Sequence, residues 1–186
     1  MDLQLLNDSL ERCPVIAATH EHNWQAAVSS PVEILFHLKA NINTLEERIK
    51  EAHQKGKFVF VHIDLAEGIA KDKAGIEYLI RVGCDGIIST RSQIIRYAKD
   101  LGILSVQRCF ALDTQGTLCI SDLLGASSPT MLEIMPGVIG KVIERFSRGK
   151  VPVIAGGLIE TKEEVTSALA HGAAAVSTGK QELWYI

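Results

Sequence analysis

Two apolar segments near the end of the chain finish in glycine and could together bind a phosphate group. They are residues 151–157, VPVIAGG, and residues 173–179, AAAVSTG. Glycine adopts backbone conformations that other residues resist, and it has no side chain to block a ligand. Two such strand ends side by side, leading into a helix N-terminus, leave backbone N–H groups free to cradle a phosphate dianion. The pattern therefore predicts an anion site, which in a (β/α)₈ barrel lies after strands 7 and 8.

Polar side chains also interrupt the predicted strand at residues 58–65, FVFVHIDL. The period of two in a strand places His62 and Asp64 on one face and the apolar residues on the other. The apolar face suits a covering of helices, so we expect His62 and Asp64 to point into a barrel near its C-terminal mouth. The alternative is a buried His–Asp pair whose members satisfy each other.

Four further strand segments carry polar residues. They contribute Glu33, His37 and Lys39 on one face of residues 32–39, Arg91 at the end of 86–91, the adjacent Gln107 and Arg108 in 104–110, and Glu133 opposite Leu132 and Ile134 in 131–137. Parity alone does not decide which of Gln107 and Arg108 faces inward. A charge buried alone costs several kcal/mol, so such groups are paired or face a ligand.

These residue types predict a pocket for a small phosphorylated polyol or sugar. His62, Asp64 and Glu133 could accept hydrogen bonds from hydroxyl groups. Lys39, Arg91 and Arg108 could balance the carboxylates or add charge to the phosphate subsite. The alternative is a set of ion pairs that neutralise one another and close the top of the barrel.

The elements that must position these residues alternate between strand and helix along the whole chain. Strand-length apolar runs begin near Val15, Val32, Phe58, Gly86, Leu104, Met131, Val151 and Ala173, and helical segments are expected at 44–53, 72–82, 92–101, 138–148 and 161–170, with a weaker one at 114–124. Such alternation predicts parallel strands joined by right-handed crossovers. We expect an α/β fold in which residues 1–186 form one compact (β/α)₈ barrel domain. An open flavodoxin-like sheet is the alternative.

Composition narrows the class of protein further. The formal charge is −3, and no apolar run reaches the roughly 18 residues of a membrane span. The N-terminus lacks the features of a signal peptide, and the four cysteines include no C-x-x-C pair, so we expect a cytoplasmic protein with reduced thiols. His20 and His22 form an H-x-H without a convincing third ligand, so neither a metal nor a cofactor is expected.

Six segments together resemble those of the glycerol-3-phosphate-responsive antiterminator proteins, which regulate glycerol-uptake operons. They are residues 60–68, 86–91, 107–108, 133–137, 154–158 and 175–178. The resemblance covers almost the whole chain in the same order. Its most specific parts are H-x-D-L-x-x-G from His62, Q-R at Gln107, and E-x-x-P-G from Glu133.

The resemblance implies a cytoplasmic bacterial regulator, and not an enzyme, that senses glycerol 3-phosphate. When ligand-bound, such a regulator acts on the leader mRNA of its target so that transcription passes a terminator. The resemblance implies that the phosphate is held by Gly156, Gly157, Ser177, Thr178 and Gly179, and the glycerol part by His62, Asp64, Arg108 and Glu133. Lys39 and Arg91 are possible charge partners, and a homo-oligomer is possible.

The residues themselves show no known RNA-binding module. Basic positions that could contact RNA are Arg145, Arg148 and Lys150 before strand 7, and Lys71 and Lys73 after strand 3. They could equally be solvated charges.

An enzyme acting on a small phosphorylated substrate is the main alternative function. His62 and Asp64, or Glu133, could serve as acid and base, and Lys39 is the nearest candidate for a Schiff base. A scaffold role would leave the phosphate cradle without a purpose.

Overall fold

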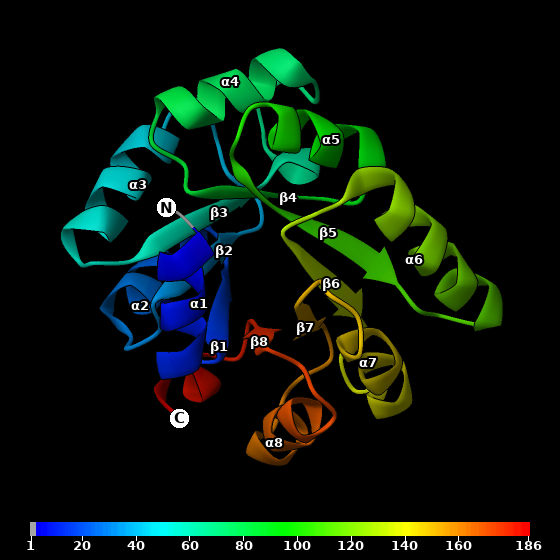
Figure 1. Cartoon of the computed structure of the whole chain (residues 1–186). Coiled ribbons are helices and arrows are strands. Elements are labelled where there is room, and N and C mark those ends of the chain that lie inside the picture. The colour runs from blue at the N-terminus through cyan, green and yellow to red at the C-terminus, as the bar shows by residue number, and fades with distance from the viewer. Residues whose placement is uncertain (1–2) are drawn as a thin grey trace.

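The computed structural model describes residues 3–186, and its centre is a closed barrel of eight parallel strands (Figure 1). Each strand pairs with the next in sequence, and β8 closes the barrel against β1. The strands are β1 (Val15–Thr19), β2 (Ile34–His37), β3 (Phe58–His62), β4 (Gly86–Ser89), β5 (Leu104–Phe110), β6 (Met131–Met135), β7 (Val153–Gly156) and β8 (Ala175–Thr178). The predicted (β/α)₈ barrel is therefore confirmed, and the open sheet is excluded.

Helices follow the strands and cover the outside of the barrel. They are α2 (Trp24–Ser29), α3 (Leu45–Gln54), α4 (Lys73–Arg81), α5 (Ser92–Asp100), α6 (Thr114–Ser127), α7 (Gly140–Ser147) and α8 (Lys162–Ala170), with a 3₁₀ helix, η3 (Gln181–Tyr185), after β8. Thr161 and Glu164 form a capping box at the start of α8, the helix expected at 161–170. The helix expected at 114–124 runs on to Ser127. Within residues 3–186, no helix combines the length and apolar character needed to cross a bilayer.

The helix α1 (Leu3–Arg12), which was not predicted, closes the N-terminal end of the barrel. Leu6 and Leu10 pack into the cluster of side chains inside the barrel. Arg12 holds the helix to the start of β2 through two hydrogen bonds to Glu33, of 2.8 and 2.6 Å. One end of the barrel is thus filled, which leaves the other end for a ligand.

The strands separate two apolar clusters. The outer cluster lies between strands and helices and includes Val59, Val61, Leu132 and Val176. The inner cluster lies among the strands and consists of Leu6, Leu10, Ile16, Ile34, Phe36, Phe60, Ile88, Leu104, Val106, Met131, Ile154 and Ala175. The inner cluster shows which residue of each strand faces inward, and so fixes the parity that the sequence left open.

Candidate functional site

The inward-facing residues change from apolar to polar toward the C-terminal end of the barrel. Five strands carry a residue two positions after a member of the inner cluster, and such a residue faces inward as well. These residues are His62 on β3, Arg108 on β5, Glu133 on β6, Gly156 on β7 and Ser177 on β8. Arg108 therefore faces inward. Gln107 lies on the other parity and donates through Nε2 to the carbonyl of Thr90 at 2.9 Å.

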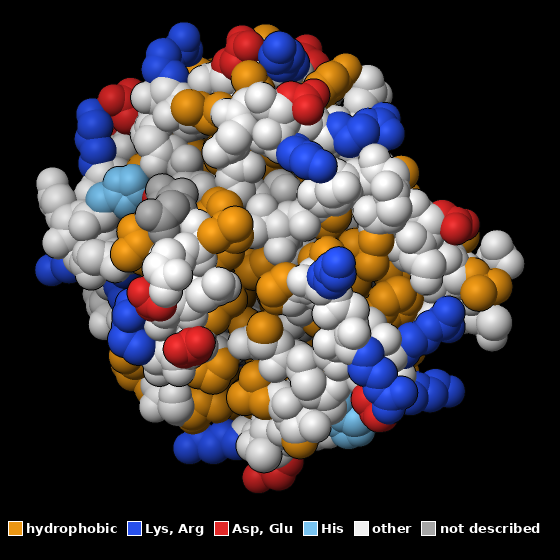
Figure 2. All heavy atoms as spheres, in the orientation of Figure 1, with side chains coloured by type: hydrophobic (Ala, Val, Ile, Leu, Met, Phe, Trp, Pro, Cys, Tyr) orange, Lys and Arg blue, Asp and Glu red, His pale blue; other side chains and the backbone are white. Residues whose placement is uncertain are grey.

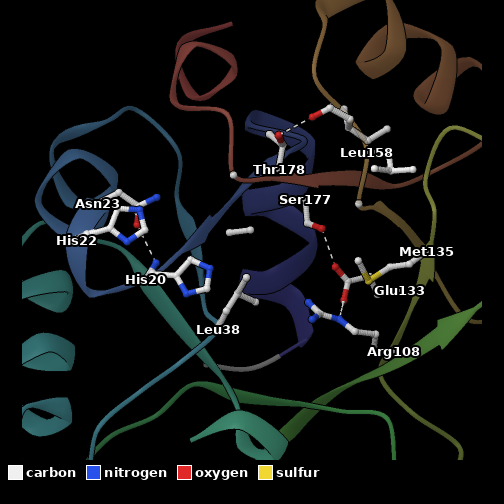
Figure 3. A pocket seen from close by; sticks show the side chains of 14 residues that line it. His20, His22, Asn23, Leu38, Arg108, Glu133, Met135, Leu158, Ser177 and Thr178 are labelled. Atoms are coloured by element: carbon white, nitrogen blue, oxygen red, sulfur yellow. Dashed lines mark hydrogen bonds and ion pairs between the residues drawn. The ribbon is translucent and has the colours of Figure 1, made fainter.

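These strand ends surround a cavity of about 290 Å³ at the C-terminal end (Figure 3). This volume lies near the lower end for small-molecule sites, about 300–1,000 Å³. The lining residues are Ala18, His20, His22, Asn23, Leu38, Arg108, Glu133, Met135, Gly157, Leu158, Ile159, Ser177, Thr178 and Gly179. A small metabolite fits such a space, whereas a macromolecule does not.

A buried chain of hydrogen bonds forms one wall of the cavity. Arg108 Nε donates to Glu133 Oε2 at 2.5 Å, and the Ser177 hydroxyl donates to Glu133 Oε1 at 2.6 Å. Both oxygens of the buried Glu133 carboxylate are thus occupied. The terminal nitrogens of Arg108 make no hydrogen bond within residues 3–186, and Figure 3 shows its guanidinium directed toward the centre of the cavity. The guanidinium is therefore oriented by Glu133 and available to an anion.

The loops after β7 and β8 supply backbone donors on the opposite wall. Within the described chain, the N–H groups of Gly157, Leu158 and Gly179 donate to no protein acceptor. Gly157 has φ +72°, and a Cβ there would lie 2.6 Å from Cε of Met135, so a larger residue would be strained in this turn. The two strand ends lie side by side, since Gly156 pairs with Ser177. The two glycine-ended segments are therefore neighbours, as the predicted cradle requires.

Two of the five residues predicted to bind the phosphate have structural roles within the protein. Gly156 does not line the cavity; it makes room for the bond between Glu133 and Ser177, since a Cβ there would lie 2.5 Å from Glu133 Oε1. The Thr178 hydroxyl donates to the carbonyl of Ile159 at 2.8 Å and accepts from the Lys180 N–H at 3.1 Å. Thr178 thus ties the β7 loop to the β8 loop.

His62 is buried beside the cavity and does not line it. Burial, and next the positive charge of Arg108, lower the pKa of His62 to about 4. The ring is therefore neutral near pH 7. Its Nδ1 is buried without a hydrogen-bond partner in the described chain.

The structure does not bring Asp64 into the cavity. β3 ends at His62, and Asp64 lies in a 3₁₀ turn, η2 (Ile63–Leu65), where the period of two no longer applies. Its carboxylate accepts from Ser89 Oγ at 2.8 Å, from the Thr90 N–H at 2.7 Å and from Thr90 Oγ1 at 2.9 Å. Burial would raise the pKa of Asp64, but these hydrogen bonds outweigh it and hold the pKa below its usual value. Asp64 thus anchors the loop after β4.

Lys39 and Arg91, the possible charge partners, do not line the cavity either. Lys39 is exposed and pairs with Glu67 at 3.0 Å. Arg91 is exposed and lies 3.7 Å from Asp64. On β2 the inward residues are Ile34 and Phe36, so His37 faces outward, where its ring lies 4.9 Å from that of Trp24.

His20 and His22, for which the sequence indicated no role, line the cavity. Their rings stack at 5.6 Å with an interplanar angle of 13°, across the cavity from Arg108 (Figure 3). Burial, and then the neighbouring His22 and Lys39, lower the pKa of His20. Their position directly after β1 was the available signal, because strand-end loops form the mouth of such a barrel. Within residues 3–186, no group of three metal-ligating side chains could hold a metal ion.

The chain matches known proteins over most of its length. A family model described as "Glycerol-3-phosphate responsive antiterminator" matches residues 15–184. An uncharacterized protein of Escherichia coli K12, YgcP, is 33% identical over 181 residues, which cover 94% of this chain and 93% of that protein.

Two solved structures are similar in both sequence and fold. The glycerol uptake operon antiterminator regulatory protein of Listeria monocytogenes is 33% identical with a TM-score of 0.86, over 92% of this chain and 95% of that one. A glycerol uptake operon antiterminator-related protein of Thermotoga maritima is 30% identical with a TM-score of 0.82, over 91% and 96%. Barrel enzymes such as an orotidine 5′-phosphate decarboxylase of Pyrococcus horikoshii are similar at 12% identity, which shows the fold alone.

Proposed function

The chain belongs to the glycerol-3-phosphate responsive antiterminator family, and we propose that it senses glycerol 3-phosphate in the cavity at the C-terminal end of its barrel. In this proposal, the ligand-bound protein acts on the leader mRNA of a glycerol-uptake operon so that transcription passes a terminator. Ligand and transcript are both found in the cytoplasm, which is where the proposal places the protein.

The observation that supports the ligand most strongly is that two walls of one small cavity carry hydrogen-bond donors without protein acceptors. The N–H groups of Gly157, Leu158 and Gly179 have no protein acceptor in the described chain, and neither do the terminal nitrogens of Arg108. Donors without acceptors suit an anion, and charge-assisted hydrogen bonds to phosphate are among the strong ones. In the proposed complex the loop amides hold the phosphate, with Gly156 and Thr178 keeping the two loops in place.

The glycerol hydroxyls then face the remaining polar groups of the cavity. Arg108 and the Ser177 hydroxyl are within the lining, and His20 and His22 form the wall across from them. Glu133 contributes by orienting Arg108 and Ser177, because both of its oxygens are already occupied. His62 and Asp64 do not line the cavity, so in this proposal neither contacts the glycerol, and Asp64 anchors the loop after β4.

Family membership indicates a regulator rather than an enzyme. The geometry agrees, because neither member of the acid–base pair considered from the sequence, His62 and Asp64, lines the cavity. Asp64 is held by Ser89 and Thr90, and His62 is buried outside the lining of the cavity. Lys39, the candidate for a Schiff base, is exposed and paired with Glu67.

Isothermal titration with glycerol 3-phosphate, glycerol and inorganic phosphate tests the ligand. We expect glycerol 3-phosphate to bind and glycerol to bind about a hundredfold more weakly, because two or more charged hydrogen bonds are lost. Equal affinity for the two, or no binding of either, would refute the ligand. Antitermination is tested by transcribing a glycerol-uptake leader template in vitro, where read-through must increase with protein only when glycerol 3-phosphate is added.

A further inference from the structure

Charge is distributed unevenly along this chain, although its total is close to neutral. Residues 91–150 carry eight Lys and Arg against five Asp and Glu, whereas the rest of the chain carries eleven against seventeen. The first segment is therefore at +3 and the remainder at −6. Such asymmetry is typical of a surface that meets a polyanion.

The basic side chains of this segment are also mostly unpaired. Within residues 91–150, five exposed cations make no ion pair: Arg96, Lys99, Lys141, Arg145 and Lys150. Elsewhere in the described chain, Arg12, Lys39 and Lys50 each bind a carboxylate, whereas the exposed Lys55, Lys73, Arg81 and Lys162 make no ion pair and lie apart from the groove. The unpaired cations lie on α5 and α7 and at the start of the β7 segment, on both sides of α6.

Figure 2 shows this arrangement on the surface. Basic side chains gather over α5 and over α7, while α6, at the right edge, is mostly uncharged. The sequence of α6 agrees, since Asp122 is the single charged residue in its 114–127 span. An uncharged strip bordered by cations suits a chain whose phosphates lie outside and whose sugars and bases lie between.

Three adjoining hollows wrap around the C-terminal end of α6, and we call them the α6 groove. The first, of about 290 Å³, lies between α5 and α6 and is lined by Arg96, Tyr97, Lys99, Asp100 and Ser128 among others. The second, of about 430 Å³, shares Ser128 with the first and reaches Lys150. The third, of about 290 Å³, shares Lys150 with the second and runs between α6 and α7 past Arg145 and Phe146. The groove is therefore continuous and has cations at both ends.

We propose that the α6 groove is the surface that binds single-stranded RNA. Arg96 and Lys99 at one end, and Arg145 and Lys150 at the other, would contact phosphates, while the half-buried ring of Tyr97 offers a stacking surface for a base. Asp100 is the one acidic residue lining the groove. A second copy of the chain fits less well, because a two-fold contact through this surface would bring like charges together.

The groove also has a structural connection to the ligand cavity. β5 carries Arg108 and leads into α6, and β6 carries Glu133 and leads into α7. The buried pair of Arg108 and Glu133 and the helices α6 and α7 of the groove therefore belong to the same two β/α units. This surface is therefore suited to respond to the ligand, and this part of the inference rests on the proposed function.

Charge reversal tests the groove. The probe is a fluorescein-labelled single-stranded RNA of 30 nucleotides and mixed sequence, followed by fluorescence anisotropy over a series of salt concentrations, each with and without saturating glycerol 3-phosphate. The variants are Arg145→Glu with Lys150→Glu, and Arg96→Glu with Lys99→Glu. The matched control is Lys50→Glu on α3 with Lys55→Glu directly after it, on the opposite side of the barrel (Figure 1). Circular dichroism verifies that each variant is folded.

We expect each groove variant to bind the probe about tenfold or more weakly, and the control to change less than twofold. The slope of log K against log salt should fall by about 1.4, since each lost phosphate contact on a single strand is worth about 0.7. Equal losses in the control, unchanged binding by both groove variants, or no binding by the wild-type protein would overturn the proposal. Light scattering that shows the groove variants dissociating a dimer, with RNA binding unchanged, would assign the surface to a second copy instead.

Titration of the same groove variants with glycerol 3-phosphate separates this proposal from the previous one. Unchanged ligand affinity beside lost RNA binding supports the groove. Wild-type RNA binding that depends on glycerol 3-phosphate but ignores the groove residues leaves the proposed function standing and overturns the groove.

Discussion

Ser177 and Glu133 are 44 residues apart in sequence and joined by a 2.6 Å hydrogen bond across β7. The strand between them allows this contact because it has Gly156 at the point of closest approach. A Cβ at that position would lie 2.5 Å from Glu133 Oε1 and 2.7 Å from Ser177 Oγ. The glycine that the sequence suggested as a phosphate ligand is thus required by the polar wall of the cavity.

Gly156→Ala should therefore destabilise the protein and weaken ligand binding. Forcing a methyl group into a filled site costs about 1–3 kcal/mol, and here it also separates a buried hydrogen-bonded pair. The free energy of unfolding in urea and titration with glycerol 3-phosphate measure the two effects.

Gly125→Ala is the matched control, because a Cβ there meets nothing within 4 Å. It should stabilise α6 by about 0.5–1 kcal/mol and leave ligand affinity unchanged. Wild-type stability in Gly156→Ala would contradict the role of this glycine.

The fold was the part of the molecule most accessible from sequence. Apolar runs of strand length alternate with helical segments, and this pattern leads to one architecture through local periodicity and crossover geometry. The same parity correctly placed Glu133 away from Leu132 and Ile134. It failed at Asp64, because parity extends only as far as the strand does and β3 ends at His62. Nothing local in a sequence marks that residue as the last of the strand.

The loop residues of the cavity were less accessible, because loops have no period. His20 and His22 line the cavity through the path of the chain after β1. Lys39 also follows a strand and is also basic, but it forms an ion pair with Glu67 instead of lining the cavity. The choice between these outcomes depends on long-range contacts that only the three-dimensional structure supplies.

Arg108→Met should destabilise the protein more than the loss of one surface charge would. The substitution leaves the buried Glu133 carboxylate without its cation, and breaking a buried ion pair in this way costs about 3–5 kcal/mol. The double variant Arg108→Met with Glu133→Met should recover most of that loss, since no uncompensated charge remains. Neither variant should bind glycerol 3-phosphate. Urea unfolding and calorimetric titration measure both properties, and a double variant no more stable than the single one would argue against an electrostatic cause.

Asp64→Asn should separate loop anchoring from ligand binding. The carboxylate accepts three hydrogen bonds from Ser89 and Thr90, and an amide cannot accept all of them as a charged group does. We expect a loss of about 1–3 kcal/mol in the free energy of unfolding, with ligand affinity within about twofold of wild type. A tenfold loss of affinity in a stable variant would instead mean that Asp64 reaches the ligand.

The buried His62 should make stability depend on pH in a defined window. Its pKa is about 4 in the folded protein and about 6.5 in an unfolded chain, so between these values the unfolded state binds more protons. Stability from this group is fully present above about pH 6.5 and is lost as the pH falls toward 4, by on the order of 3 kcal/mol in total. Urea unfolding of His62→Gln should show a flatter dependence across this window. An NMR titration of the His62 ring with a midpoint near 6.5 in the folded protein would disprove the explanation.

Protonation of His20 should strengthen the binding of glycerol 3-phosphate. In the free protein, burial, followed by His22 and Lys39, lowers the pKa of His20. A phosphate dianion in the cavity would favour the protonated ring and raise that pKa, so binding takes up a proton. By linkage, affinity must increase as the pH falls through the interval between the free and bound pKa values.

Calorimetry in two buffers of different ionisation enthalpy reports the proton uptake directly. His20→Asn should abolish the uptake and flatten the pH dependence, whereas Lys39→Gln, which removes one of the cations that lower the pKa of His20, should move the rise in affinity to higher pH. Proton uptake that persists in His20→Asn would place the titrating group elsewhere in the cavity.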